Sequence, residues 1–440
     1  MKKNVISMFL ILIVIVCFPA IAFADNGSID KGDTTFIMIS AALVFFMIPG
    51  LALFYGGMSR KKNVLNTIMN VFIVIGIVSI QWVLFGYSLS FGSDNFSIIG
   101  GFDFLGFNNV GAEASGTIPH TVFAMYQMMF AIITAALITG AFAERMRFPA
   151  MIAFILLWTT LVYDPLAHWV WAADGWLFKL GALDFAGGTV VHISSGIAGL
   201  VAAIIIGKRK GFGKVPIIPH NLTLVVIGTG ILWFGWFGFN AGSALAANGL
   251  AANAFLVTNT SAAAGLLSWV LIEWMYHGKP TVLGAASGAV VGLVAITPAA
   301  GFVSPLSAII IGLLVSPLCY FAISVLKPKL GYDDSLDAFG CHGIGGIWGA
   351  IATGLFASEK VNPNGANGLF FGNPSLLWTQ IISVVATIAL SGIFTFVILK
   401  TVSLFTKLRV TEKEEDEGLD LSLHGEDAYP DFSPEEGIAL

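Results

Sequence analysis

The sequence consists largely of apolar segments about 20 residues long, a length that crosses the hydrocarbon core of a bilayer as a helix. Only 11% of the 440 residues are charged, whereas soluble domains contain about 25%, so most of the surface cannot face water. This composition excludes an ordinary soluble enzyme, a nucleic-acid-binding protein and a disordered scaffold. We therefore predict an all-α polytopic membrane protein.

The apolar segments predict eleven transmembrane helices, at residues 34–57, 66–92, 120–143, 149–168, 188–207, 222–240, 253–276, 281–299, 303–326, 338–357 and 376–404. Eleven spans divide into five, five and one. Because five is odd, two such halves would cross the membrane in opposite directions, as a 5+5 inverted repeat plus one extra helix.

The basic residues predict the orientation of these spans. Sixteen lysines and arginines lie in alternate loops or at and after the end of the last span, and only three lie in the opposite loops and the mature N-terminus. The positive-inside rule places the more basic side in the cytoplasm. We therefore expect an N-out/C-in topology.

The N-terminus has the pattern of a secretory signal. Lys2 and Lys3 precede an apolar run, and the small residues of Ala22-Phe23-Ala24 follow it. We interpret residues 1–24 as a cleaved signal peptide, with a permanent first helix as the alternative. The remaining predicted domains are a transmembrane domain, 25–405, and a cytoplasmic C-terminal tail, 406–440. The three cysteines provide no disulfide framework.

Of the seven histidines, His120 and His168 lie near outer helix ends, and only His192 and His342 fall inside apolar spans. His192 follows Asp184 by eight residues, and His342 follows Asp337 by five. Each aspartate is a candidate cap for the helix that carries the histidine. A rise of 1.5 Å per residue places His192 roughly 12 Å and His342 roughly 7–8 Å from these aspartates, on helices that enter from opposite sides. We expect the two imidazoles to meet near the midplane.

The buried histidines allow three interpretations. Ionisable residues at membrane depth usually face a transport pathway, but two structural histidines that bond across helices would give the same pattern. A metal site needs further ligands, and no third mid-membrane histidine, cysteine cluster or carboxylate is present. We therefore predict no metal and no cofactor.

Aromatic residues are concentrated near the predicted outer ends of several spans. They are Trp169, Trp171, Trp176, Tyr126, Phe130, Trp236, Phe237 and Phe239. Such residues form the interfacial belt of many membrane proteins, and a cluster of them also binds a cation through the ring faces. Composition does not choose between these two interpretations.

Four segments resemble signatures of the ammonium transporter (Amt/Mep/Rh) family. They are Gly181-Ala-Leu-Asp-Phe-Ala-Gly-Gly-Thr-Val-Val-His192, Gly235-Trp-Phe-Gly-Phe-Asn-Ala-Gly-Ser243, Asp337-Ala-Phe-Gly-Cys-His-Gly343 and Phe142-Ala-Glu-Arg-Met-Arg-Phe148. The resemblance runs from about residue 34 to Tyr429 and is to the bacterial Amt branch. It implies a multi-pass protein of the bacterial plasma (inner) membrane that is not an enzyme.

The resemblance also implies roles for individual residues. In this family an outer site recruits ammonium, a phenylalanine pair gates the pore, and twin histidines line it. Here the outer-site residues are Trp171, Phe130 and Ser243, supported by Asp184; the gate is Phe130 and Phe239; the twin histidines are His192 and His342.

The tail resembles the regulatory tail of the Amt branch. The segment Gly418-Leu-Asp-Leu-Ser-Leu-His-Gly-Glu-Asp-Ala-Tyr429 carries this likeness. It implies a homotrimer with one pore per subunit and a PII signalling protein as the partner at the cytoplasmic face. We assign no role to residues 430–440.

The leading hypothesis is an ammonium transporter that binds ammonium outside, deprotonates it and conducts ammonia through a hydrophobic pore. An ion at the bilayer centre is costly, which favours passage of the neutral species, with or without a separately relayed proton. The alternatives are an ammonium sensor with little transport, an electroneutral Rh-like ammonia channel, and a membrane enzyme that uses the histidine pair.

Overall fold

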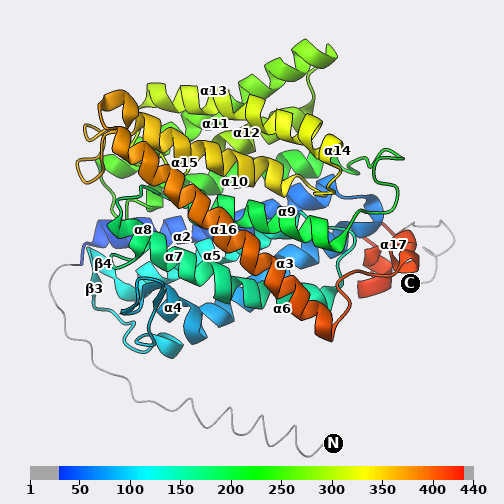
Figure 1. Cartoon of the computed structure of the whole chain (residues 1–440), viewed down its shortest axis with the longest axis horizontal. Coiled ribbons are helices and arrows are strands. Elements are labelled where there is room, and N and C mark those ends of the chain that lie inside the picture. Colours follow the sequence, from blue (N-terminus) through cyan, green and yellow to red (C-terminus); the bar gives the residue numbers. More distant parts are fainter. Residues whose placement is uncertain (1–28, 431–440) are drawn as a thin grey trace, which may run out of the picture.

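The computed structural model describes residues 29–430, which form a bundle of long helices (Figure 1). The predicted signal peptide, 1–24, lies outside the described residues. The helices are α2 (Lys31–Met58), α3 (Val64–Gln81), α4 (Tyr87–Phe91), α5 (His120–Ile138), α6 (Phe148–Trp158), α7 (Asp164–Trp171), α8 (Trp176–Lys179), α9 (Ser194–Ile206), α10 (Leu222–Gly242), α11 (Gly249–His277), α12 (Val282–Ile296), α13 (Pro305–Phe321), α14 (Lys327–Leu330), α15 (Ile344–Phe356), α16 (Pro374–Phe405) and α17 (Glu412–Glu417).

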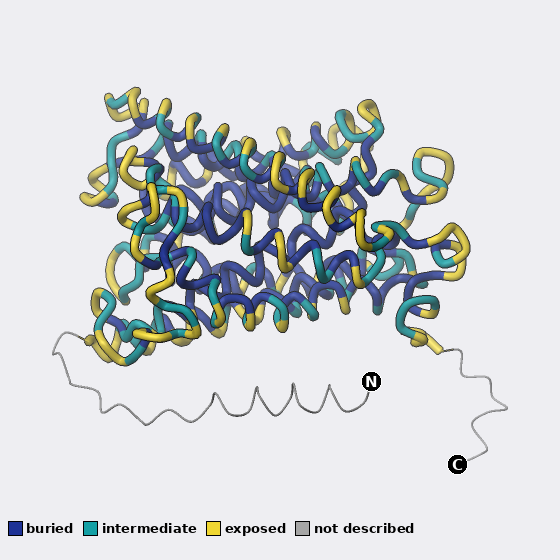
Figure 2. The backbone as a smooth tube through the Cα atoms, turned by 60° about the horizontal axis from the view of Figure 1, so that its bottom comes forward, coloured by how far each residue is buried: buried dark blue, intermediate teal, exposed yellow. Residues whose placement is uncertain are grey.

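Two short antiparallel hairpins lie in the segment between α4 and α5. They consist of β1 (Asp94–Asn95) with β2 (Ile99–Gly100), and β3 (Ala114–Ser115) with β4 (Ile118–Pro119). Figure 1 places β3, β4 and α8 at one end of the bundle and α17 at the opposite end, while α16 crosses the bundle diagonally. Buried residues run through the middle of the bundle, and the loops at both ends are the most exposed (Figure 2).

The helix lengths agree with most of the predicted spans. Ten helical stretches in the described range are long and apolar enough to cross a membrane. The predicted span 281–299 corresponds to α12, which has only 15 residues, fewer than the roughly 20 that a straight span needs. Ten spans are therefore supported by length and composition, and the eleventh and the N-out/C-in orientation stay predictions.

Several long helices contain or begin with a π-helical turn. Three turns interrupt a helix, at η3 (Trp82–Gly86), η5 (Thr159–Tyr163) and η7 (Ala322–Leu326). Two others, η6 (Gly188–Ile193) and η8 (Phe339–Gly343), lead directly into α9 and α15. Such turns are rare and often occur at functional sites. Both predicted pore histidines lie in the turns that begin a helix.

Glycines let the two histidine-bearing segments cross at close range. A Cβ atom added to Gly196 would lie 2.2 Å from the main-chain nitrogen of Gly343, and one added to Gly346 would lie 3.0 Å from the carbonyl oxygen of Gly188. Small residues of this kind allow helix backbones in a membrane to approach closely. The close approach places η6 next to η8 in the centre of the bundle.

The loops that precede the two histidine segments dock in equivalent places. The N–H of Phe185 donates to the carbonyl of Pro298, just after α12. The N–H groups of Ser335 and Leu336 donate to the carbonyls of Ala141 and Gly140, just after α5. Each loop therefore binds the end of the third predicted span of the opposite half, and the 5+5 inverted repeat stays a prediction.

A buried network of charges anchors the second of these loops. Asp333 accepts hydrogen bonds from the main-chain N–H and the guanidinium of Arg209, with an Nη2–Oδ1 distance of 2.8 Å. The buried Arg145 guanidinium donates to the carbonyl of Asp333 and to the hydroxyl of Ser335. Burial alone raises the pKa of Asp333, but the hydrogen bonds and charge of Arg209 outweigh it and lower the pKa.

The tail packs against the same end of the bundle. Glu415 is buried and accepts hydrogen bonds from the main-chain N–H of Lys210 and the guanidinium of Arg409, both at 2.6 Å. Asp420 accepts from the first N–H groups of α3, at Leu65 and Asn66. A negative charge at the positive N-terminal end of a helix is stabilising, so Asp420 helps to hold the tail against α3. Specific polar contacts of Glu415 and Asp420 thus fix the tail to the bundle.

We predict that Gly196→Ala destabilises the protein by about 1–3 kcal/mol, because the new methyl group meets backbone rather than a movable side chain. Thermal unfolding of the purified protein measures the effect. Gly230→Ala is the matched control, since a Cβ atom there meets nothing within 4 Å. Equal melting temperatures for the two variants would show that the crossing tolerates side chains.

We predict that Asp333→Asn costs about 3–5 kcal/mol, because Arg209 is left buried without its full counter-charge. A carboxylate with a lowered pKa stabilises the fold above its unfolded pKa, and this contribution is lost as the pH falls through the folded value. The difference between wild type and variant is therefore largest at neutral pH and shrinks below about pH 4. Unfolding measured across this range tests both statements.

Candidate functional site

The two histidines predicted to line a pore lie face to face. The ring centroids of His192 and His342 are 5.3 Å apart, and the ring planes are inclined by 21°. Both side chains are buried, at 1% and 5% exposure. Neither ring nitrogen of His192, nor Nδ1 of His342, has a hydrogen-bond partner among the described residues. Buried polar atoms are almost always bonded, so these nitrogens indicate a site for a polar ligand.

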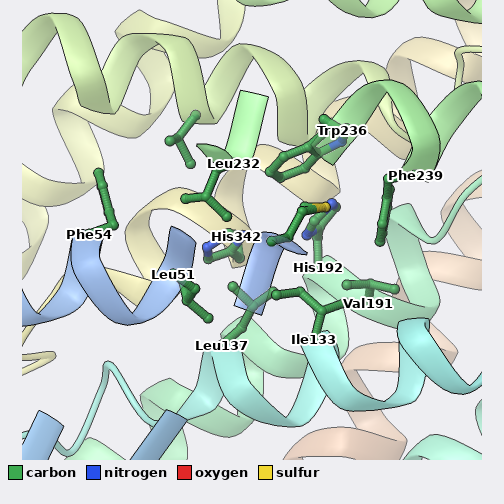
Figure 3. Close-up of a pocket in the computed structure, with 12 residues that line it drawn as sticks. Leu51, Phe54, Ile133, Leu137, Val191, His192, Leu232, Trp236, Phe239 and His342 are labelled. Carbon is green, nitrogen blue, oxygen red and sulfur yellow. The ribbon is translucent and has the colours of Figure 1, made fainter. Parts of the chain in front are cut away.

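The imidazoles line a narrow cavity (Figure 3). Its lining residues are Met47, Leu51, Phe54, Ile133, Leu137, Val191, His192, Leu232, Trp236, Phe239, Val290 and His342. The volume of about 10 Å³ is near the minimum that a single water-sized molecule requires. In Figure 3 Phe239 and Phe54 lie on opposite sides of the histidine pair. Apart from the imidazoles and the indole N–H of Trp236, the cavity is lined by apolar side chains.

A stacked phenylalanine pair lies beside the histidines. The rings of Phe130 and Phe239 are 4.3 Å apart at 25°, and Phe239 is 6.1 Å from His192. Phe130 is on α5 and Phe239 on α10, two helices that α2 also contacts. Both side chains are fully buried. The pair therefore separates the histidine cavity from the residues beyond it.

The predicted outer-site residues gather on the far side of this pair. The indole of Trp171 meets Phe130 edge-on, with centroids 5.7 Å apart. Tyr126 contacts Phe130 and places its hydroxyl 3.3 Å from Ser243 Oγ. The Ser243 hydroxyl donates to the carbonyl of Phe239 at 2.9 Å, which leaves oxygen lone pairs to accept from a ligand. Trp171, Phe130 and Ser243 are thus brought together by α7, α5 and the end of α10.

Asp184 supports the site through the backbone. Its carboxylate accepts from the N–H groups of Gly187, Gly188 and Thr189 at 2.6–2.8 Å, and from the Thr189 hydroxyl. Its carbonyl accepts from the indole N–H of Trp171 at 3.0 Å. The side chain caps the turn that carries His192 and is only 9% exposed. Asp184 therefore connects the outer aromatic cluster to the first histidine.

The predicted cap at Asp337 is wrong. The carboxylate of Asp334 accepts from the N–H groups of Ala338 and Phe339 instead, at 3.1 and 2.8 Å. Asp337 has a backbone φ of 59°, which turns its side chain away to pair with Lys327 at 2.6 Å. The sequence contained the correct signal, because Asp334 precedes His342 by eight residues, the same spacing as Asp184 and His192.

Sequence reasoning also missed a residue that lines the histidine cavity. The sequence places Trp236 among aromatics that form either an interfacial belt or a cation-binding cluster, but its ring stacks on His192, with centroids 5.5 Å apart at 23°. Its indole N–H donates to Thr297 at 2.9 Å. The sequence signal for this role of Trp236 was its position three residues before Phe239, because residues three apart lie on one face of a helix. In residues 29–430, no three His, Cys, Asp or Glu side chains are grouped so that they could hold a metal.

Comparison with known proteins identifies the family. Residues 35–429 match the Ammonium Transporter Family. The chain is 59% identical to an ammonium transporter of Bacillus subtilis over 405 residues, which cover 91% of this chain and 99% of that protein. The chain belongs to the ammonium transporter family. The ten long apolar helices accordingly make it a multi-pass membrane protein.

Two solved structures have the same fold as this chain. Mep2 of Saccharomyces cerevisiae superposes with a TM-score of 0.83 at 39% identity, over 88% of this chain and 89% of that one. A protein named Sensor Amt Protein superposes with a TM-score of 0.84 at 30% identity, over 90% of this chain and 98% of that one.

We predict that Asp184→Asn destabilises the protein by about 1.5–3 kcal/mol, because an amide replaces one acceptor oxygen with a donor that faces N–H groups. The melting temperature of the purified protein is the measurement. Asp174→Asn is the control, because that carboxylate is exposed and only pairs with Lys179 at 3.6 Å. Equal melting temperatures would contradict a capping role for Asp184.

Proposed function

We propose that this protein is a transporter that moves ammonium into the cytoplasm as ammonia. In this proposal the ion binds at Trp171, Phe130 and Ser243, loses a proton, and crosses the Phe130–Phe239 gate as the neutral molecule. The observation that carries the proposal is the stacked pair, His192 and His342, with unpartnered nitrogens in a narrow apolar cavity.

The cavity selects by size and polarity. A sugar or an amino acid needs many polar partners, whereas the lining offers mainly two imidazoles. Ammonia has three donors and one lone pair, and a neutral imidazole offers one acceptor and one donor. A molecule the size of water therefore finds hydrogen-bond partners at His192 and His342, and a larger polar solute does not fit.

The outer cluster is suited to the charged form. The aromatic faces of Trp171 and Phe130 attract a cation, by about 0.5–2 kcal/mol depending on desolvation. The Ser243 oxygen supplies a hydrogen-bond acceptor. Asp184 supports the cluster through its bond to Trp171, while its own carboxylate oxygens are occupied by main-chain N–H groups.

Deprotonation follows from the change in surroundings. A charge that enters the apolar cavity loses its hydration and gains no counter-ion, which costs several kcal/mol or more. Ammonium avoids this cost by releasing a proton before it passes the phenylalanine pair. The released proton is relayed separately along His192 and His342, so that one positive charge enters with each ammonia molecule. Potassium has no proton to release, so the same cavity excludes it.

The proposal extends to the assembly and its location. The family likeness supports a homotrimer in the bacterial inner membrane, with the mature N-terminus outside and the tail of residues 406–440 as a cytoplasmic regulatory segment that a PII protein contacts. The described part of this tail is already docked through Glu415 and Asp420. Light scattering of the detergent-solubilised protein gives the number of subunits.

A second candidate is an ammonium sensor that transports little. The likeness to the protein named Sensor Amt Protein favours it. A third outcome is electroneutral passage of ammonia alone, as expected of an Rh-like channel. All three candidates use the same binding residues. The sensor differs in moving little ammonium, and the Rh-like channel differs in that ammonia crosses without any net charge.

We predict a saturable inward current after an ammonium jump on proteoliposomes, and none after a potassium jump. His192→Ala and His342→Ala should each lower the current by at least about tenfold, because each removes one of the two imidazoles that line the centre of the pathway. His277→Ala is the control, since this exposed histidine lies at the end of α11 and bonds only to Tyr320.

The outcomes separate the candidates. A missing current together with internal alkalinisation, reported by a pH dye, would mean electroneutral ammonia passage. No signal in either assay would contradict transport and favour the sensor. A full current in both histidine variants would place the pathway elsewhere.

A further inference from the structure

All seven histidines lie in the described residues, and their hydrogen-bond partners set one of them apart. His120 lies between the Glu113 carboxylate and the Tyr87 hydroxyl, and His220 lies between the Ser59 carbonyl and the Tyr429 hydroxyl. His277 bonds the Tyr320 hydroxyl, and His424 faces an Asn66 amide nitrogen. Each of these four rings thus has one partner that is able to donate. A neutral imidazole, with one donor and one acceptor nitrogen, satisfies such partners. His192 and His342 have the unpartnered nitrogens of the cavity.

His168 differs because both of its ring nitrogens face acceptors. Nδ1 lies 3.0 Å from the main-chain carbonyl oxygen of Ser90, and Nε2 lies 3.0 Å from a carboxylate oxygen of Asp94. The side chain is completely buried. A carbonyl never donates, so Nδ1 carries a hydrogen, and an ionised Asp94 requires a hydrogen on Nε2 as well.

The surroundings keep Asp94 ionised. Its second carboxylate oxygen accepts from the N–H of Ser97 at 3.0 Å, and the hydrogen bond from His168 lowers the pKa of Asp94 below its usual value. Lys179 adds a favourable charge on the same side. Asp164, one turn before His168 on α7, is directed instead to the Gln81 amide at 2.6 Å. The buried His168 ring therefore lies between a main-chain carbonyl oxygen and the carboxylate of Asp94.

This pair lies next to the outer aromatic cluster. His168 precedes Trp171 by three residues on α7, and its carbonyl accepts from Ala172, which ends the helix just after Trp171. Trp169 donates its indole N–H to the carbonyl of Ile98 at 2.7 Å. Contacts of His168 and Trp169 thus hold segment 90–98 against α7. These two residues shortly precede Trp171, which meets Phe130.

We propose that His168 is a positioning residue, a charged clamp that fixes α7 against segment 90–98 and so sets Trp171 in the outer site. The proposal rests on the function proposed above. The imidazolium attaches the helix to two acceptors at once, which a neutral ring cannot do. Its charge is balanced by Asp94, so the clamp adds no net repulsion toward an incoming cation.

The charge is tested by nitrogen-15 NMR of the full-length protein in lipid, labelled at histidine. At about pH 8, where a free imidazole is neutral, we expect one ring with both nitrogens protonated, and its loss in His168→Gln. Asp94→Asn, a change on the surface hairpin, should also abolish this signal. A spectrum with only neutral rings, or a signal that persists in His168→Gln, would overturn the proposal.

The positioning role is tested by transport kinetics on the same proteins. We expect His168→Gln and Asp94→Asn to raise the KM for ammonium by about threefold or more, with Vmax within about twofold of wild type. Asp174→Asn, an exposed carboxylate near the same end of α7, should change neither value. An unchanged KM, or a fall in Vmax alone, would overturn the positioning role.

The two readouts also separate this inference from the function on which it rests. Absence of ammonium transport in the wild-type protein would contradict the proposed function. The NMR measurement does not depend on transport, and it would still support or overturn the charged state of His168.

Discussion

The close crossing of the two histidine segments is the constraint on which the site depends. Gly196 against Gly343, and Gly346 against Gly188, allow backbone contacts that any side chain would prevent. Only at this separation do the imidazoles stack at 5.3 Å. The π-helical turns η6 and η8 displace the histidines from regular helix positions at the point of crossing, and the loops before them dock on the ends of α5 and α12.

The centre of the bundle contains destabilising unpartnered polar atoms, whereas contacts toward its ends stabilise the fold. Each unpartnered buried nitrogen costs about 1–3 kcal/mol, and His192 has two such atoms. By contrast, Asp184 and Asp334 satisfy the first N–H groups of the two histidine segments. Beyond them, one end of the bundle is held by buried ion pairs such as Arg209–Asp333, and the other by the aromatic cluster. These contacts at both ends stabilise a bundle whose centre contains unpartnered imidazole nitrogens.

The sequence predicted most of the helices and the two central histidines of the site. It predicted less well how the side chains of the site are arranged. Apolar length located ten of the eleven spans, but α12 is shorter than its segment because Thr297 begins the turn that receives the loop from the other half. The pairing of His192 with His342 followed from their positions in apolar spans. The cap at Asp337 was wrong, since a positive φ directs that carboxylate to Lys327. Trp236 was missed because its stacking on His192 depends on packing between α10 and η6.

By itself, the sequence determined that this chain forms apolar helices with two ionisable rings at membrane depth, because charge and hydropathy are read residue by residue. The tertiary structure decided which polar atoms are left without partners and which are fully bonded. His168 and His192 are both buried histidines on largely apolar helical segments, yet one lies between two acceptors and the other meets none. That difference arises from contacts between residues distant in the sequence, so no local pattern contains it.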